Sequence, residues 1–325
     1  MRNENNNPAA KRRGNYVSLN NRPEGSKTMI RNNSENGINA NKVGGANGNV
    51  GGNGGNGGNK NSNRFSRNSS RQSRPFRGAL REDIYLSVVV PAYNEEGRVP
   101  KTLVTISDYL KKQPYTYEII VANDGSKDGT GRAVEAMIGK VAKLKLLDNQ
   151  TNHGKGYVVR QGMMAARGQI RLFTDSDNST PIEEVEKLLP LFKQGYDVVI
   201  GSRHAAGAKL EPAQPPLRQF LGWGWRVLTN IVVGTWAIAD TQCGFKAMSA
   251  KAVQEIMPKC RIDRFAFDPE ILILAKSYGY RIKEVGILWK NDARSTVKVS
   301  SMVKMFKDLL RIRLNQIKGL YGKSR

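Results

Sequence analysis

Cysteine and histidine are scarce in this chain of 325 residues, which contains two of each. Cys243 and Cys260 do not have the spacing of metal ligands, and we expect both to be reduced in a cytosolic setting. His153 and His204 are too few and too far apart in sequence to suggest a zinc site.

Long apolar runs are missing as well. No segment reaches the ~18–20 apolar residues that span a bilayer. The nearest candidate, Val227–Ala239, is uncharged but contains threonine, asparagine and glycine, so we expect a buried or interfacial helix there. The start of the chain lacks the apolar core of a secretory signal.

Apolar residues are also few in residues 1–80, which are rich in Asn, Gly, Ser and Arg. Such a segment buries too little surface to offset its ordering entropy, so it predicts a disordered tail. It contains 14 Lys or Arg and 3 Glu, out of a formal net charge of +24 for the chain. A basic tail is typical of nucleic-acid or anionic-membrane binding, and equally of a solvated extension. Residues 81–325 have the length of one α/β domain.

From residue 86 onward, strand-like and helix-like segments alternate, which favours an α/β fold with a doubly wound, mostly parallel sheet. The β-branched run Leu86–Val90 predicts the first buried strand, and the spacing of apolar residues predicts a helix over Glu95–Lys112. Asp240–Lys246 is predicted to be a loop or a short strand. The other predicted strands are 118–122, 143–147, 170–174, 197–200 and 281–289, and the other helices are 130–141, 156–166, 181–192, 268–278 and 300–321.

Acidic clusters follow two of these strands. In open α/β sheets, ligands bind outside the carboxyl ends of the strands. Asp175 and Asp177 can share a Mg²⁺ or Mn²⁺ ion that also holds substrate phosphates, or they can belong to a capped helix before Pro181. Asp124 suits contact with a base or ribose, and equally the capping of the next helix.

Further candidates lie in loops near the same strands. The segment Pro91–Glu95, with Tyr93, can grip a nucleotide, but it is also good turn sequence. Lys155 sits between two glycines at the start of a helix, which suits a phosphate or ribose as well as a solvated loop. Basic side chains beside predicted loops suit phosphate recognition or simple solubility, and they are Arg203, Arg218 and Lys246.

The segment 300–321 predicts an amphipathic helix. At 100° per residue, one broad face is apolar, and Lys304, Lys307, Arg311 and Lys318 gather opposite it. This pattern fits a membrane interface. It also fits a helix packed on its own domain.

These motifs together resemble family 2 glycosyltransferases with a GT-A (Rossmann-like) fold, from about Leu86 to Gly319. The resemblance is nearest to the dolichyl-phosphate β-glucosyltransferase and polyprenyl-phosphate sugar synthase group. The motifs of the broad superfamily are Pro91–Glu95, Asn123–Ser126 and Asp175–Asp177. The motifs of the narrower group are Gly201–Arg203, Asp240–Lys246, Arg264–Glu270, Glu284–Trp289 and Lys307–Arg313.

The resemblance implies a nucleotide-sugar site and an acceptor site. It places Asp124 on the base, and Asp175 and Asp177 on the nucleotide and the metal. The other donor-binding residues it suggests are Pro91, Tyr93, Glu95 and Lys155. It places Arg203, Arg218 and Lys246 near the acceptor phosphate, and the expected catalytic residues are Asp177, Arg203 and Asp240. Asp240 is expected to orient the sugar or Lys246 rather than to act as a base.

The expected activity is inverting transfer of a sugar, with glucose from UDP-glucose expected, to a polyprenyl or dolichyl phosphate. The protein is then expected on the cytosolic face of a membrane, held by interfacial helices and basic charge. Two departures from related mannose enzymes, at Ser179 and at Ser295-Thr296, leave GDP-mannose open as the donor. A non-catalytic nucleic-acid-binding or scaffold protein that uses its basic tail is the alternative from another class.

Overall fold

The computed structural model describes residues 28–31, 83–212, 216–236, 238–290 and 299–322. The chain divides into two compact units, residues 1–33 with 83–325 and residues 34–82, and every described residue belongs to the first. The nucleic-acid alternative rests on the basic tail, of which only residues 28–31 are described. The departure at Ser295-Thr296 also lies outside the described residues.

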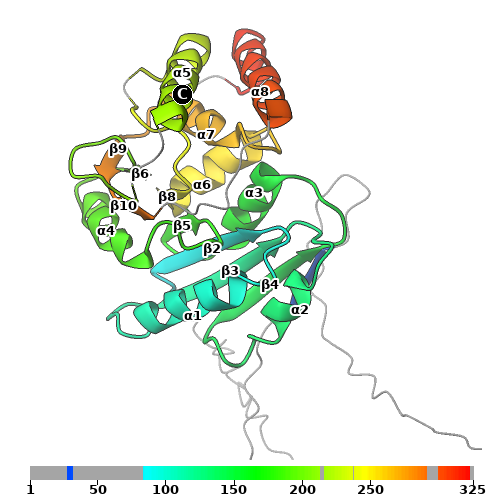
Figure 1. The fold of residues 1–325 in the computed structure, drawn as a ribbon. Coiled ribbons are helices and arrows are strands. Elements are labelled where there is room, and N and C mark those ends of the chain that lie inside the picture. Colours follow the sequence, from blue (N-terminus) through cyan, green and yellow to red (C-terminus); the bar gives the residue numbers. More distant parts are fainter. Residues whose placement is uncertain (1–27, 32–82, 213–215, 237, 291–298, 323–325) are drawn as a thin grey trace, which may run out of the picture. The chain divides into compact units, whose positions relative to one another are not determined.

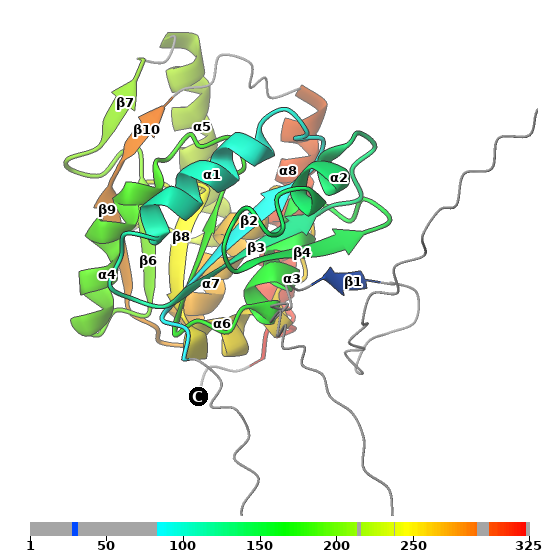
Figure 2. The same ribbon diagram turned by 90° about the horizontal axis from the view of Figure 1, so that it is seen from below.

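The described part of the chain is built on an eight-stranded sheet with the order β1-β4-β3-β2-β5-β8-β6-β9 (Figures 1 and 2). β4, β3, β2 and β5 run parallel. β8 lies antiparallel between β5 and β6, and β6 is parallel to β9. The sheet strands are β1 (Thr28–Arg31), β2 (Leu86–Ala92), β3 (Tyr117–Asn123), β4 (Leu144–Asn149), β5 (Ile170–Thr174), β6 (Val198–Ser202), β8 (Phe245–Ser249) and β9 (Ile282–Gly286). The predicted α/β fold with a mostly parallel sheet is confirmed.

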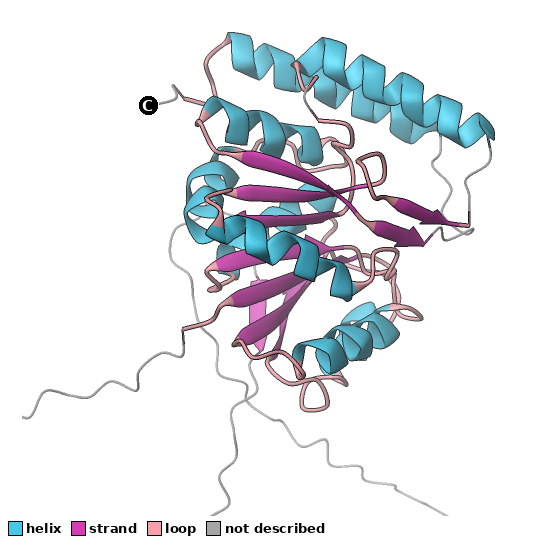
Figure 3. Ribbon diagram, turned by 90° about the vertical axis from the view of Figure 1, so that its left-hand side faces the viewer, coloured by secondary structure: helices cyan, strands magenta, loops and turns pink. Residues whose placement is uncertain are grey.

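Helices cover both faces of this sheet (Figure 3). Because successive side chains of a strand point to opposite faces, β2 contributes to two cores. Val89 packs in the cluster that includes α3, α6 and α7, whereas Val88 and Val90 pack in the cluster that includes α1 and α4. The helices are α1 (Val99–Leu110), α2 (Thr130–Glu135), α3 (Lys155–Ala165), α4 (Val185–Lys193), α5 (Pro216–Val233), α6 (Ala250–Ile256), α7 (Phe267–Ser277) and α8 (Val299–Ile317).

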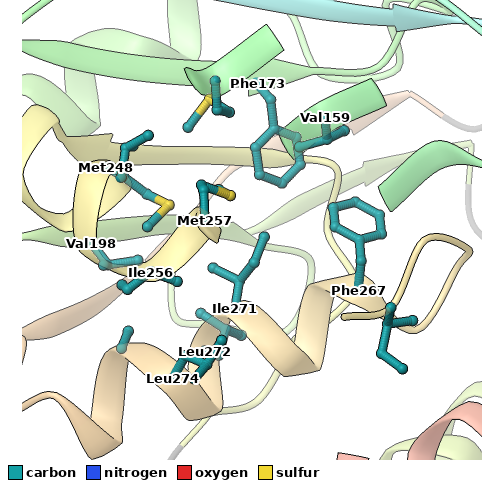
Figure 4. Packing of buried hydrophobic residues seen from close by; sticks show 14 of the residues in the cluster. Val159, Phe173, Val198, Met248, Ile256, Met257, Phe267, Ile271, Leu272 and Leu274 are labelled. Carbon is teal, nitrogen blue, oxygen red and sulfur yellow. The ribbon is translucent and has the colours of Figure 1, made fainter. Parts of the chain in front are cut away.

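The core beneath β5 fixes the start of α7. Phe267 of α7 faces Phe173 of β5, with ring centroids 5.8 Å apart, and Ile271 lies one turn further along the helix (Figure 4). Burying a side chain of this size contributes about 1.5–3 kcal/mol. The first turn of α7 is therefore held directly under the carboxyl end of β5.

Residues 28–31 correct one expectation, because they lie inside the segment predicted to be a disordered tail. They form β1, which pairs antiparallel with β4 at the edge of the sheet. Thr28 and Ile30 are β-branched and Met29 is apolar, a composition that suits a strand. The remainder of residues 1–80 lies outside the described residues.

Two helices are shorter than the spacing of apolar residues predicted. The helix predicted over 95–112 begins at Val99, because Asn94 adopts a positive φ of 55° and the chain turns before Pro100. The helix predicted over 130–141 ends at Glu135 and is followed by turns, with Gly139 at a φ of 101°. Only the second segment keeps apolar residues beyond its helix, at Met137, Ile138 and Val141.

The region after β6 contains elements that the sequence pattern did not resolve. The segment Asp240–Lys246, predicted as a loop or short strand, ends in β8, so Lys246 is a residue of the central sheet. The last predicted strand divides into β9 and a short β10 (Leu288–Lys290), which pairs in parallel with β7 (Lys209–Glu211). The pairing of β8 with β5 places Phe245 and Lys246 beside Thr174 and Phe173.

Candidate active site

The carboxyl ends of β2, β3, β4, β5 and β6 meet at one edge of the sheet, because these strands all run in the same direction. Antiparallel β8 begins at that edge. The edge thus receives Asp124 from β3, Asp175 and Asp177 from β5, and Arg203 from β6. Lys155, at the start of α3, joins them through an ion pair with Asp175.

Asp124 is buried and is bound to the loop before α3. Its carboxylate accepts hydrogen bonds from the backbone N–H of His153 at 2.7 Å and of Gly154 at 2.9 Å. The side-chain amide of Asn152 donates a third bond at 2.8 Å. Burial raises the pKa of Asp124, and these backbone donors oppose that shift. Asp124 therefore fixes the loop that presents Lys155.

The capping interpretation of Asp124 is wrong for the helix that follows it. In α2, the N–H of Thr130 bonds to Asp128 at 3.0 Å instead. Gly125 makes the sharp turn after Asp124 possible. Its φ is +63°, and a Cβ there would lie 2.4 Å from the carbonyl carbon of Thr151. Only glycine combines that backbone conformation with such a close approach.

Lys155 and Asp175 form an ion pair, with Nζ 2.6 Å from Oδ1. Burial lowers the pKa of Lys155, but the carboxylates of Asp175 and Asp268 outweigh it and raise that pKa. On its other side, Asp175 meets the backbone of Gly244, where a Cβ would lie 2.2 Å from Oδ2. The charge of Asp175 is thus compensated within the protein.

Asp177 stands in a tight turn two residues further on. Its Oδ1 accepts the N–H of Ser179 at 2.9 Å, and Asn178 between them has a positive φ of 57°. The hydroxyl of Thr102 on α1 holds the turn by donating to the carbonyl of Ser176 at 2.7 Å. Burial raises the pKa of Glu95, and the nearby Asp177 carboxylate adds to that shift.

These positions bear on the predicted shared cation. Among the described residues, no group of three or more His, Cys, Asp or Glu side chains is placed to hold a metal ion. Mg²⁺ needs fewer protein ligands than that, because it binds through one or two carboxylates together with substrate phosphates. Asp177 fits that role as a partly exposed carboxylate, whereas Asp175 is already paired with Lys155.

Arg203 and Asp240 form a bidentate ion pair. Nε and Nη2 of Arg203 lie 2.7 and 2.8 Å from the carboxylate oxygens, and the backbone N–H of Arg203 adds a bond of 3.0 Å. Although burial raises it, the Arg203 guanidinium holds the pKa of Asp240 well below its usual range. The backbone N–H of Asp240 in turn donates to Glu284 at 2.7 Å.

The guanidinium of Arg203 also lies over the ring of Trp289, 5.6 Å from its centroid. Asp240 thus orients Arg203, while its expected role toward the sugar stays a prediction. A carboxylate that is ionised and fully engaged in this way is a poor general base.

Lys246 differs most from its expected place. It is fully buried, and its Nζ lies 2.5 Å from Oδ1 of Asp268 on α7. It also donates to the carbonyl of Cys243 and lies 5.5 Å from the ring centroid of Phe173. Because no part of it reaches solvent, Lys246 does not face an acceptor phosphate in this structure.

Asp268 is a residue that sequence reasoning did not select. It was seen only as part of the Arg264–Glu270 motif, although an acidic residue in the first turn of α7 was a usable signal. Burial raises the pKa of Asp268, and Lys246 and Lys155 lower it. It belongs to a cluster of alternating charges beneath the site: Lys246, Asp268, Lys155 and Asp175.

The loop after β2 lies at the carboxyl ends of the strands, on one side of the candidate site. The N–H of Asn94 donates to Ser126 at 2.9 Å, and the N–H of Lys127 donates to the side chain of Asn94 at 2.9 Å. Pro91 lies within β2, and the loop after it, which carries Glu95, is tied to the turn after Asp124, while Tyr93 is left 41% exposed. Arg218 lies on α5, and its side chain is outside the described part of the chain.

The sequence profile described as Glycosyl transferase family 2 matches residues 87–257, from the second residue of β2 to the residue that follows α6. The chain belongs to this family. It is 38% identical to a dolichyl-phosphate beta-glucosyltransferase of Trichomonas vaginalis over 250 residues, covering 74% of each chain. It is 34% identical to the Saccharomyces cerevisiae enzyme of that name, covering 74% of this chain and 77% of the yeast chain.

Solved structures support the fold. The mannosyl-3-phosphoglycerate synthase of Rubrobacter xylanophilus superposes with a TM-score of 0.52 at 15% identity, covering 74% of this chain and 77% of the other. A glucosyl-3-phosphoglycerate synthase of Mycobacterium tuberculosis, in complex with Mn²⁺, UDP and its product, gives 0.51 at 18% identity and covers 74% and 81%. These likenesses confirm the GT-A-like fold that the motifs implied.

Proposed function

We propose that this protein transfers glucose from UDP-glucose to dolichyl phosphate, with inversion at the anomeric carbon. The observation that carries the proposal is the pairing of an acidic edge, at Asp175 and Asp177, with a rigid cation, Arg203, on the neighbouring part of the sheet. The names of the relatives support dolichyl phosphate as the acceptor and glucose as the sugar, and the two charged parts of the sheet edge are assigned to a donor diphosphate and to the acceptor phosphate.

The donor is assigned to the side formed by β3, β5 and α3. Asp124 and the exposed Tyr93 are assigned to the nucleoside, and Lys155, whose pKa is also raised by the Asp177 carboxylate, is assigned to the diphosphate. Asp177 is the residue assigned to hold Mg²⁺ or Mn²⁺, with Asp175 in support. Such an ion, when bound, offsets the negative charge that grows on a departing nucleoside diphosphate.

The acceptor phosphate is assigned to Arg203, with Arg218 in support. A phosphate monoester has a second pKa of about 6, so it is mostly a dianion at neutral pH and needs little help from a base. It does need a cation to offset its repulsion by the donor. Asp240 orients the Arg203 guanidinium for this role. The buried Lys246–Asp268 pair lies beside Lys155 and supports the position of the Lys155–Asp175 pair.

Donor choice is the direct test of this function. With a short polyprenyl phosphate as acceptor, we expect turnover with UDP-glucose to exceed turnover with GDP-mannose by about 100-fold or more, as a site built for one base and sugar rejects another. Equal or faster turnover with GDP-mannose would assign the chain to the mannosyl alternative.

The described residues contain no helix long and apolar enough to cross a membrane. We place the protein on the cytosolic face of a membrane through α8. Part of its apolar surface packs on its own domain, and the rest is available to a membrane interface. Leu309 and Ile312 are buried in the core. A second set of apolar side chains on α8 remains exposed: Val303, Phe306, Leu310, Leu314 and Ile317.

Positive charge accompanies that exposed stripe, since Lys304, Lys307, Arg311 and Arg313 are also exposed. Each Lys or Arg near an anionic leaflet adds about 1 kcal/mol of attraction. α5 lies beside α8 and exposes Trp223 and Ile231 (Figures 1 and 3).

The double substitution Leu310→Asp and Ile317→Asp should weaken binding to vesicles of phosphatidylcholine and phosphatidylserine by about tenfold or more, because each buried leucine or isoleucine is worth about 1.5–3 kcal/mol. Sedimentation with vesicles measures this. Val104→Asp on α1 changes an apolar side chain that is 43% exposed, close to the 42% of Leu310, so it serves as the control and should leave binding unchanged. Unaltered binding of the double variant would remove α8 from the membrane contact.

A further inference from the structure

Glu270 is a fully buried carboxylate on α7 that none of the assigned substrate contacts uses. Its Oε1 accepts the N–H of Arg261 at 2.9 Å and the hydroxyl of Tyr321 at 2.7 Å. Its Oε2 accepts the N–H of Ile262 at 2.9 Å. Burial raises the pKa of Glu270, and these donors oppose the shift. Glu270 therefore joins two separate segments, the loop 260–266 and the residues after α8.

The other side of that loop packs on the start of α3. The carbonyl of Asp263 accepts the N–H of Tyr157 at 3.1 Å. A Cβ on Gly154 would lie 2.4 Å from this same carbonyl oxygen, and one on Gly156 would lie 2.5 Å from the carbonyl oxygen of Ile262. The loop thus touches the backbone on both sides of Lys155, so its position sets that of Lys155.

The residues after α8 are anchored by further bonds. The side-chain amide of Asn315 on α8 donates to the Tyr321 hydroxyl at 3.3 Å. The hydroxyl of Tyr278 donates to the carbonyl of Tyr321 at 2.8 Å, and Arg261 donates to the carbonyl of Leu320 at 3.2 Å. A continuous path of hydrogen bonds thus leads from α8 through Tyr321 and Glu270 to the loop.

We propose that Glu270 and Tyr321 are positioning residues that hold the loop 260–266 against α3 and thereby set the donor affinity of the enzyme. They act on Lys155 through its flanking glycines, and on Asp124 through the Gly154 N–H that it accepts. A displacement of the residues after α8 should consequently also displace the donor side of the active site. The inference rests on the proposed assignment of Lys155 and Asp124 to the donor.

Glu270→Gln tests it, because an amide offers one acceptor oxygen where the carboxylate offers two, so one of the donors loses its partner. We expect the Kd for UDP-glucose, measured by calorimetry on the full chain, to rise about tenfold, which is the effect of one lost hydrogen bond of ordinary strength. The KM for dolichyl phosphate should stay within about twofold, because the change lies on the donor side. Amide hydrogen exchange of residues 152–158 should become faster.

Tyr321→Phe removes the hydroxyl but leaves both backbone bonds of Glu270, so its effect on the donor Kd should be about threefold. Glu118→Gln is the matched control. Glu118 is a buried carboxylate at the start of β3 that accepts the Ser87 hydroxyl at 2.7 Å and the Arg167 N–H at 2.6 Å, and it also pairs with Lys145 at 2.6 Å. Glu118→Gln should lower thermal stability at least as much as Glu270→Gln without changing the donor Kd.

An equal rise in donor Kd for Glu118→Gln and Glu270→Gln would overturn the proposal, as would unchanged exchange of residues 152–158 in Glu270→Gln. Lys155→Ala separates this inference from the function on which it rests. If Lys155→Ala left the donor Kd unchanged, the donor assignment would be wrong. Faster exchange of residues 152–158 in Glu270→Gln would still support the positioning role of the loop.

Discussion

Asp177→Asn is expected to lower kcat by about 1,000-fold or more while the protein remains folded. Removing a preorganised charge that stabilises a departing anion commonly lowers the rate 10²–10³-fold, which is about 3–4 kcal/mol. Here the substitution would also weaken binding of the metal ion that Asp177 is assigned to hold. The amide preserves the shape and one acceptor for the Ser179 N–H, so thermal stability should change little. Turnover is measured over a range of Mg²⁺ and Mn²⁺ concentrations.

Asp128→Asn is the control for this experiment. Asp128 is an exposed carboxylate at the same edge of the sheet, where it caps the first turn of α2. Its amide still accepts the Thr130 N–H, so turnover should stay within about twofold of the wild type. A wild-type rate for Asp177→Asn at every metal concentration would exclude Asp177 as the metal ligand.

Asp240→Asn is expected to affect both activity and stability. It removes the charge that balances Arg203 in a buried, bidentate pair, and breaking such a pair costs about 3–5 kcal/mol of unfolding free energy. Because Arg203 would lose its fixed orientation, kcat/KM for dolichyl phosphate should fall about 100-fold. Urea unfolding and steady-state kinetics measure the two effects.

The stability part of this prediction has a defined pH dependence. The pKa of Asp240 is depressed in the folded state, so its contribution is complete above the unfolded value of about 3.9 and is lost as the pH falls toward the folded value. The difference in unfolding free energy between wild type and Asp240→Asn should therefore shrink below about pH 4.

Glu184→Gln serves as the comparison for Asp240→Asn. It breaks the Glu184–Lys187 pair of 2.6 Å, in which the lysine is 45% exposed, and such pairs contribute about 0–1 kcal/mol. A loss in Asp240→Asn no larger than in Glu184→Gln would contradict the buried-pair argument. So would a loss that is constant from pH 7 to pH 3.

The sequence predicted the sheet edge correctly because its signals are local. Apolar runs such as Leu86–Val90 and Ile170–Thr174 form strands in the structure, and the acids that follow them necessarily lie where the strands end. The direction of the parallel strands then brings Asp124, Asp175 and Asp177 to one edge, which the β-α alternation already implied.

Pairing among charged residues was not predictable in the same way. Lys246 meets Asp268 because β8 enters the sheet antiparallel between β5 and β6. Lys155 meets Asp175 because the start of α3 lies beside the carboxyl end of β5. No local pattern marks the antiparallel strand β8, so Lys246 was expected beside a loop rather than inside the central sheet. The helical periodicity of α8 was visible in the sequence, but which part of its apolar face is buried depends on where α8 docks.

The position of Asp268 has a practical consequence for fragments of this protein. The family match ends at residue 257, which leaves Asp268 and Glu270 beyond its limit. A fragment trimmed to that limit would retain Lys246 in the middle of the sheet without the carboxylate of Asp268. It would also lose the contact between the loop 260–266 and the start of α3. Expression of the trimmed piece is therefore expected to give insoluble material, and a minimal soluble catalytic unit must extend at least to Tyr321.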